Sequence, residues 1–222
     1  KEYRRQRQMC IRDRVTNTSD SYDGFIGRFP GSTGAATVTG VGSQWSNSDD
    51  LWIGGNDSAA GGIGTLNLYD SGLVTVTNLT KLWDTGTLNL DGGSLTTGSF
   101  DNSEAGTFNF HDGTLTVNGT GGVFDPGVDD FSVNGNAADD APHLVIANTA
   151  TTTLAGDLTV GQIGSGFLSV ESGGVGSNAL GLLEGEATVT GSGSRWDNSN
   201  YLTVGEYRDA TLNVTDGGVV TS

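Results

Sequence analysis

Short runs of apolar residues alternate with small polar residues along most of the chain. In residues 64–76, Leu66 and Leu68 are expected on one side of an extended strand, with Thr65 and Asn67 on the other, because successive side chains of a strand face opposite ways. An Asp-Ser-Gly turn and a second short run follow. The same order recurs at residues 86–98, 106–118, 166–178 and 210–222. The pattern predicts strand–turn–strand units, and no stretch shows the spacing of an apolar helix face.

The spacing of these units indicates a repeat. Their starts at residues 64, 86, 106, 166 and 210 fit one, one, three and two steps of 20–22 residues. Each step then corresponds to one coil of an all-β, right-handed, single-stranded parallel β-helix, a solenoid of 20–22-residue coils. The Asp-Gly turns also fit β-hairpins, which would instead give an antiparallel meander or sandwich.

One outward position favours the solenoid over the hairpins. The same place in the unit is held by Asn67, Asn89, Asn109 and Asn213, with Ser169 as the exception. In a parallel stack in register, like residues lie above one another, and asparagine side chains then bond amide to amide. We therefore predict an asparagine ladder on the outside of the solenoid.

A longer motif marks two places in the chain. Residues 36–54 and 187–205 are identical at 12 of 19 positions, and the shared positions include Trp45/Trp196 and Gly54/Gly205. We interpret these residues as structural marks of the repeat. Packing under a loop is favoured over sugar stacking for the two tryptophans, because both recur as part of the unit.

Two regions depart from the pattern. Residues 119–157 are irregular, and we expect loops there between strands at 131–133, 143–146 and 152–154. Residues 1–14 hold six of the ten Lys and Arg residues and the sole Cys and Met. They lack an apolar signal-peptide core, resemble a translated sequencing-adaptor run, and are set aside as a non-native or disordered leader, with a basic tail as the alternative. The repeat body then covers residues 15–222.

The charge of the body excludes one class of partner. From residue 15 onward, four basic residues stand against 24 acidic ones. Such a surface repels phosphate backbones, so nucleic acid is not an expected partner. Exposed carboxylates also keep a long β surface from associating with itself. No run of about 20 apolar residues predicts direct membrane insertion.

The motif combination resembles a known family. Ala-Thr-Val-Thr-Gly-x-Gly-Ser-x-Trp-x-Asn-Ser, then Leu-x-Val-Gly and Gly-Thr-Leu-x-Val-x-x-Gly-Gly, is similar to the repeat of autotransporter (type V secretion) passengers and PEP-CTERM-associated proteins. The match is tightest at 187–222, departs at 55–63, and does not cover the middle of the chain. The resemblance implies a right-handed parallel β-helix at the surface of a Gram-negative bacterium or secreted from it.

The same resemblance implies a larger protein. The chain neither begins with Met nor ends after a completed unit, and we expect it to be a fragment. Neighbouring repeats and a transporter or anchor domain would lie outside it. Surface or matrix glycans and proteins of a host are the partners that such a passenger would meet.

Chemical motifs are scarce. The chain has no Gly-x-Ser-x-Gly, His-Glu-x-x-His, Cys-x-x-Cys or P-loop motif. His111 holds a turn position that other residues fill elsewhere, so it is interpreted as a surface residue. We predict no catalytic residue, no cofactor and no metal ligand.

Calcium is the metal considered most closely, because the body is so acidic. Oxygen ligands could come from the pairs Asp49–Asp50, Asp129–Asp130 and Asp139–Asp140, or from the nonapeptide-like run at 173–180 with Asn178 in the ligand place. Solvated loop acids are the favoured interpretation of the three pairs, and a chance match is the favoured interpretation of the single imperfect run.

Two functions remain from the sequence. The first is a non-catalytic structural or adhesive passenger segment of a secreted or surface-displayed bacterial protein. The alternative is a carbohydrate-active enzyme, a polysaccharide lyase or hydrolase, on the same scaffold. A column of turn acids is predicted along one corner, formed by Asp70, Asp91, Asp112 and Asp216. Three convergent carboxylates in a groove beside exposed aromatics would favour the enzyme.

Overall fold

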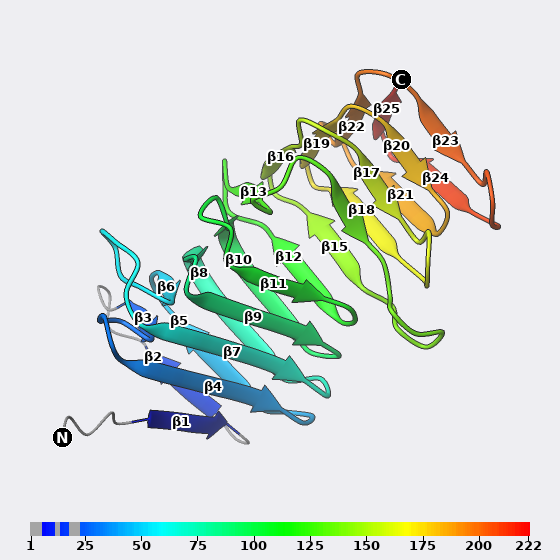
Figure 1. The fold of residues 1–222 in the computed structure, drawn as a ribbon. Helices are drawn as coiled ribbons and strands as arrows, with labels where there is room; N and C mark the ends of the chain where they lie inside the picture. Colours follow the sequence, from blue (N-terminus) through cyan, green and yellow to red (C-terminus); the bar gives the residue numbers. More distant parts are fainter. Residues whose placement is uncertain (1–5, 12–13, 18–22) are drawn as a thin grey trace.

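The protein is a three-sided β-solenoid without helices in the part of the chain that the structure, a computed structural model, describes: residues 6–11, 14–17 and 23–222. Every strand pairing between its named strands is parallel, and each strand pairs with strands one coil away (Figure 1). In Figure 1 the nearest strands run from left to right while successive coils climb, which makes the solenoid right-handed. The all-β parallel β-helix predicted from the sequence is confirmed, and the antiparallel sandwich is wrong.

Each coil contributes one strand to each of three faces, here called faces I, II and III. Face I consists of β1 (Gln6–Ile11), β4 (Thr33–Thr39), β7 (Ile63–Tyr69), β9 (Gly86–Asp91) and β11 (Thr107–Phe110), and then of β14 (Phe131–Val133), β17 (Leu158–Val160), β20 (Gly181–Leu183) and β23 (Leu202–Val204).

Faces II and III are joined by two long strands that bend around the corner between them, β8 (Leu73–Leu82) and β10 (Ser94–Asp101). Face II also holds β2 (Arg14–Asn17), β5 (Gln44–Asn47), β12 (Thr114–Val117), β15 (His143–Ile146), β18 (Phe167–Glu171), β21 (Glu186–Thr190) and β24 (Thr211–Thr215). Face III also holds β3 (Gly24–Ile26), β6 (Leu51–Ile53), β13 (Val123–Asp125), β16 (Thr151–Thr153), β19 (Val175–Asn178), β22 (Arg195–Asn198) and β25 (Val219–Thr221).

The apolar positions of the repeat fill the interior. Leu66 of β7 pairs in register with Leu88 of β9, and both side chains are fully buried. Leu68 and Leu90 form the next buried column. Apolar side chains stacked in this way build one continuous core along the axis, because no coil can bury its inner face alone.

The predicted asparagine ladder is present on face I. Asn89 Nδ2 donates to Asn67 Oδ1 at 2.7 Å, and Asn109 Nδ2 donates to Asn89 Oδ1 at 2.7 Å. Asn213 does not belong to it: it lies on face II beside Thr188, and its Nδ2 donates to Glu186 Oε1. The ladder therefore spans three coils on one face.

Asn89→Ala should lower the free energy of unfolding by about 1–2 kcal/mol, because it removes two side-chain hydrogen bonds at a half-exposed site where water recovers part of the loss. Urea denaturation measures the change. Asn213→Ala is the matched control and should cost less. Equal losses for the two variants would show that the ladder adds nothing.

Face I is interrupted between β11 and β14. β11 pairs with β9 alone and β14 pairs with β17 alone. The rings of Phe108 and Phe131 nevertheless stack across the break, with centroids 6.3 Å apart and planes 9° from parallel. Aromatic packing thus continues the core column where the backbone ladder stops.

The coil length differs from the prediction. Successive strands of face I from β4 onward begin at residues 33, 63, 86, 107, 131, 158, 181 and 202, so the coils contain 21 to 30 residues. Two of these seven steps are 21 residues, within the predicted 20–22, and loops lengthen the other five to 23–30 residues. The gap from residue 106 to residue 166 is two and one-third turns, since it leads from β11 on face I to β18 on face II.

The repeat sequence therefore changes face along the solenoid. Residues 36–54 begin on β4 of face I, whereas their copy at 187–205 begins on β21 of face II. Trp45 consequently lies on face II and Trp196 on face III. Residues 126–130 and 134–142 form loops in the irregular region, as expected, and strands β14 and β15 lie where they were predicted.

The leader contributes to the solenoid where it is described. Residues 6–11 form β1, which pairs in register with β4. This part of residues 1–14 is thus a strand and not disordered, since its backbone bonds to the sheet edge. Its origin stays a prediction, and residues 1–5 and 12–13 lie outside the described residues.

Candidate functional site

The long motif forms the same packing unit twice. Trp45, Asn47 and Leu51 surround the Cα of Gly24 at the start of β3, and a Cβ there would lie 2.9 Å from Leu51. The equivalent residues of the second copy, Trp196, Asn198 and Leu202, surround Gly181 of β20. Each tryptophan therefore fills the core over a glycine of the preceding coil. Trp45 is 6% exposed and Trp196 is fully buried, so both serve packing, as predicted.

A buried chain of asparagine amides accompanies the second tryptophan. Trp196 Nε1 donates to Asn178 Oδ1 at 2.7 Å, and Asn178 Nδ2 donates to Asn198 Oδ1 at 2.9 Å. Asn198 Nδ2 donates to the carbonyl of Thr221. Sequence reasoning missed this inner ladder, although the repeated Trp-x-Asn in the motif was its signal. Because Asn178 is occupied here, the nonapeptide-like run does not present it to a cation.

Gly54 directly follows β6 on face III, and Gly205 directly follows β23 on face I. Both have positive φ, 85° and 71°. A Cβ on Gly54 would lie 2.5 Å from Gly86 N, whereas one on Gly205 would lie 3.2 Å from the carbonyl oxygen of Arg208. Glycine is required there for backbone conformation and, at Gly54, also for the close approach of the next coil.

Many carboxylates bind backbone N–H groups of the following coil. Asp50 accepts from Leu79 at 2.9 Å, Asp112 from Ala141 at 3.0 Å, Asp130 from Asp157 at 2.8 Å and Asp157 from Leu180 at 3.2 Å. The partners lie 23 to 29 residues further along the chain. The N–H groups of Ala141, Asp157 and Leu180 lie outside the strands, and that of Leu79 lies within β8. Part of the acidity of the body thus joins coil to coil.

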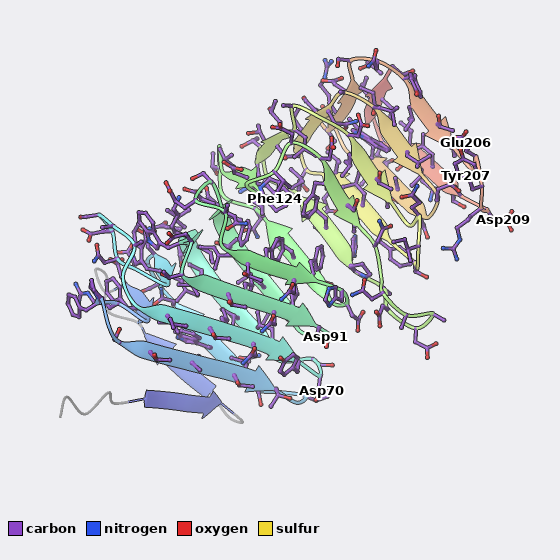
Figure 2. All side chains as sticks on the ribbon, viewed as in Figure 1. Asp70, Asp91, Phe124, Glu206, Tyr207 and Asp209 are labelled. Atoms are coloured by element: carbon purple, nitrogen blue, oxygen red, sulfur yellow. The ribbon has the colours of Figure 1, made fainter. Side chains whose placement is uncertain are left out.

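Glu184 is the most buried acid of this kind, with 3% of its surface exposed. Its two carboxylate oxygens accept the N–H groups of Glu206, Tyr207 and Arg208 at 2.6 to 3.1 Å. Figure 2 labels Glu206 and Tyr207 at the C-terminal end of the solenoid, where they follow β23. Sequence reasoning missed Glu184, because its partners lie one coil away.

The predicted acidic column is divided between two corners. Asp70 and Asp112 follow β7 and β11, and Asp91 is the last residue of β9, so all three line the corner between faces I and II. Figure 2 shows Asp70 and Asp91 at this edge. Asp216 follows β24 and lies at the corner between faces II and III. The prediction that all four form one column is wrong, because the repeat changes face between the first three and the last.

Among the described residues, one group of three acids has carboxylate oxygens within 4.8 Å of one another: Asp23, Asp49 and Asp50. Clustered oxygen ligands of this type suit a hard cation such as Ca²⁺. The sequence indicated the pair Asp49–Asp50, while Asp23 joins it from the preceding coil. Asp49 also accepts a hydrogen bond from Asn78 Nδ2 at 2.7 Å.

The cluster is electrostatically unfavourable. Burial raises the pKa of Asp50 above its ordinary value of 3.8, the charges of Asp23 and Asp49 raise it further, and the N–H of Leu79 opposes them. A raised carboxyl pKa means that the folded chain holds this proton more tightly than the unfolded chain. The resulting stabilisation is present at low pH and is lost as the pH rises through the raised pKa.

Asp50→Asn should therefore raise the free energy of unfolding at pH 7, because it removes the charge and keeps an acceptor for Leu79. The gain should vanish below pH 3.8, the ordinary pKa of the residue. Urea denaturation at the two pH values measures it. Asp91→Asn, on an exposed turn away from the cluster, is the control. A variant less stable than the wild type at pH 7 would contradict the prediction.

The pairs Asp129–Asp130 and Asp139–Asp140 each contain one acid that binds backbone N–H groups. Asp140 Oδ2 accepts the N–H groups of Asn136 and Ala137 at 2.9 and 2.8 Å, so it caps its own loop. Asp130 accepts the N–H of Asp157 in the following coil, and Asp129 is exposed.

A groove follows the outer side of face III. One part, about 580 Å³, is lined by Asp125, Asp129 and Thr153, and an adjoining part, about 420 Å³, by Ser177 and Asp197. The two parts share Thr153 and Ala155 and so form one continuous feature. Its lining mixes polar and apolar groups, with exposed valines at the edge, among them Val123 and Val128.

Two ion pairs neutralise acids along the same face. Lys81 Nζ lies 2.8 Å from Asp101 Oδ2, and Arg195 lies 2.9 Å from Asp197. Burial alone would raise the pKa of Asp101, but hydrogen bonds from Lys81 and Ser103 outweigh it and lower the pKa below 3.8. Both acids are thus held ionised by their partners at neutral pH.

Neither histidine joins an acid–base constellation. His111 follows β11 at a turn, as interpreted from the sequence. His143 Nε2 lies 2.8 Å from Ser169 Oγ on face II. Burial lowers the pKa of His143, against the charges of Glu171 and Glu186, so its ring is mainly neutral at pH 7. No carboxylate is hydrogen-bonded to this ring in the described structure.

Comparison of the chain with protein-family models, curated proteins and solved structures found no match. No helix in the described part of the chain is long and apolar enough to cross a membrane. The candidate sites therefore rest on the geometry of the solenoid.

Proposed function

We propose that this chain is a non-catalytic structural and adhesive segment of a secreted or surface-displayed bacterial protein. The single observation that carries the proposal is the use of its acids. Asp50, Asp112, Asp130, Asp157 and Glu184 hold backbone N–H groups of the following coil. Carboxylates bound in this way stiffen a rod. The resemblance of the motif to autotransporter and PEP-CTERM-associated repeats supports the surface location.

The carbohydrate-active enzyme remains the second candidate, because the groove of face III contains Asp125 and Asp129. Asp125 Oδ1 accepts the N–H of Gly127 at 2.8 Å, and the neighbouring Asp101 is paired with Lys81. Exposed aromatic rings are missing from the residues that line this groove. A lyase or hydrolase needs a free acid and a free base beside the scissile bond. Here Asp125 caps a turn and Asp101 is paired with Lys81, so the groove fits that requirement less well.

Incubation with soluble polysaccharides tests the proposal. Reducing-end release and formation of unsaturated products should both stay at the level of a heat-denatured control. Product that disappears in Asp125→Asn but persists in Asp91→Asn, a surface acid outside the groove, would replace the structural role with an enzymatic one.

A further inference from the structure

The outer side of face III presents two parallel files of side chains. In the first, Asp101 pairs with Asp125, Thr153 with Ser177, and Ser177 with Asp197. In the second, Val123 pairs with Thr151, and Thr151 pairs with Val175. The first file is polar, whereas the second alternates valines with polar residues, because Arg195 follows Val175 in it. Both run along the axis beside the groove with a step of about 4.8 Å per coil.

The polar file offers unused hydrogen-bonding groups. The hydroxyl groups of Thr153 and Ser177 have no side-chain hydrogen bond among the described contacts, and Thr153 is exposed. Asp125 uses Oδ1 for Gly127 and leaves Oδ2 for another donor. Asp197 is fixed by Arg195 and by the hydroxyl of Thr221 at 2.7 Å. The file therefore presents donors and acceptors held in register by the sheet.

The second file lies beside the first on the same outer side of these strands. Val123 is 48% exposed and Val128 at the groove edge is 54% exposed. Exposed valines beside an ordered polar row are amphipathic in the way that a pyranose ring is, with C–H groups on its faces and hydroxyls at its rim. A polypeptide would not require this division along the groove, whereas a sugar chain matches it at each residue.

The charge of the groove limits the class of ligand that it can bind. The protein carries a net charge of −16, and within the groove Asp125 and Asp129 stand without a basic partner. A polyanion would be repelled there. Lys81 and Arg195 are held by Asp101 and Asp197 and cannot act as free anion binders. The geometry and charge together favour an uncharged chain.

We propose that the groove of face III binds an extended neutral polysaccharide along the solenoid axis, across the coils from β13 to β22. This inference rests on the proposed adhesive function and names the class of its ligand. The polysaccharide lies with sugar C–H faces against Val123 and Val128, and with hydroxyl groups toward Asp125, Thr153, Ser177 and Asp197. No bond is made or broken.

Affinity electrophoresis of the full chain in native gels tests the proposal. The probes are hydroxyethylcellulose, laminarin and xylan as neutral chains and polygalacturonate as the anionic one. At least one neutral polymer should retard the protein, and polygalacturonate should not. Thr153→Arg, which fills the centre of the groove, should weaken retardation about tenfold. Thr116→Arg, at an outward position of face II, should leave it within about twofold.

The possible results separate the two proposals. If no neutral polymer retards the protein, or if Thr153→Arg and Thr116→Arg lose retardation equally, the proposal that the groove binds a polysaccharide is wrong. The proposed structural role would not be affected. Retardation by polygalacturonate alone also overturns it. Binding accompanied by cleavage of the polymer supports the groove and overturns the non-catalytic function. Circular dichroism of both variants verifies that each is folded as the wild type is.

Discussion

Gly54→Ala should lower the free energy of unfolding by about 4 kcal/mol or more, a large loss for the addition of one methyl group. The φ of 85° at Gly54 costs an alanine about 1–2 kcal/mol by itself. The added Cβ would also lie 2.5 Å from Gly86 N of the following coil. Because that contact is with backbone, the two coils must separate for the methyl group to fit.

A second glycine provides a control with the same backbone conformation. Gly42 also has a φ of 85°, but a Cβ there meets nothing within 4 Å. Gly42→Ala should thus cost about 1–2 kcal/mol, the conformational part alone. Gly205→Ala should be intermediate, because its nearest contact is 3.2 Å. Urea denaturation followed by far-ultraviolet circular dichroism measures all three, and equal losses at Gly54 and Gly42 would contradict the close-approach argument.

Glu184→Ala should be the second large loss, about 3–4 kcal/mol for the terminal coils. The substitution leaves the N–H groups of Glu206, Tyr207 and Arg208 without their acceptor, and an unsatisfied buried polar group costs about 1–3 kcal/mol. Glu184→Gln should lose less, since one carbonyl oxygen remains. The effect should be concentrated at the C-terminal end, because stability in a solenoid is mainly a sum over neighbouring coils.

Amide hydrogen exchange resolves this effect by position. Residues 206–208 should exchange faster in Glu184→Ala, while β7 and β9 should keep their protection. Glu186→Ala is the matched control two residues away. Its exposed side chain accepts a single hydrogen bond, from Asn213 at 3.2 Å. Unchanged protection at 206–208 in Glu184→Ala would show that the carboxylate does not hold this loop.

The candidate groove also depends on the stacking of distant residues. Asp125, Thr153, Ser177 and Asp197 share no sequence motif, and the intervals between them follow the local coil lengths. The sequence therefore does not show that these four residues line one groove, nor does it distinguish them from other polar residues of the repeat. Of the three clustered acids, the sequence indicated Asp49 and Asp50, which are adjacent in the chain. It did not indicate Asp23, because that residue comes from another coil.

The sequence by itself determined the architecture. Alternation of apolar and polar residues specified strands, turn glycines specified corners, and the recurrent asparagine required a parallel stack in register, which Asn67, Asn89 and Asn109 form. These features are local or repeat with the unit, so they are readable along the chain. The tertiary structure decided which face each copy occupies, because loop lengths accumulate until Trp45 and Trp196 lie on different faces. For the same reason Asp216 lies at a different corner from Asp70. Each proposed site depends on how the coils stack on one another.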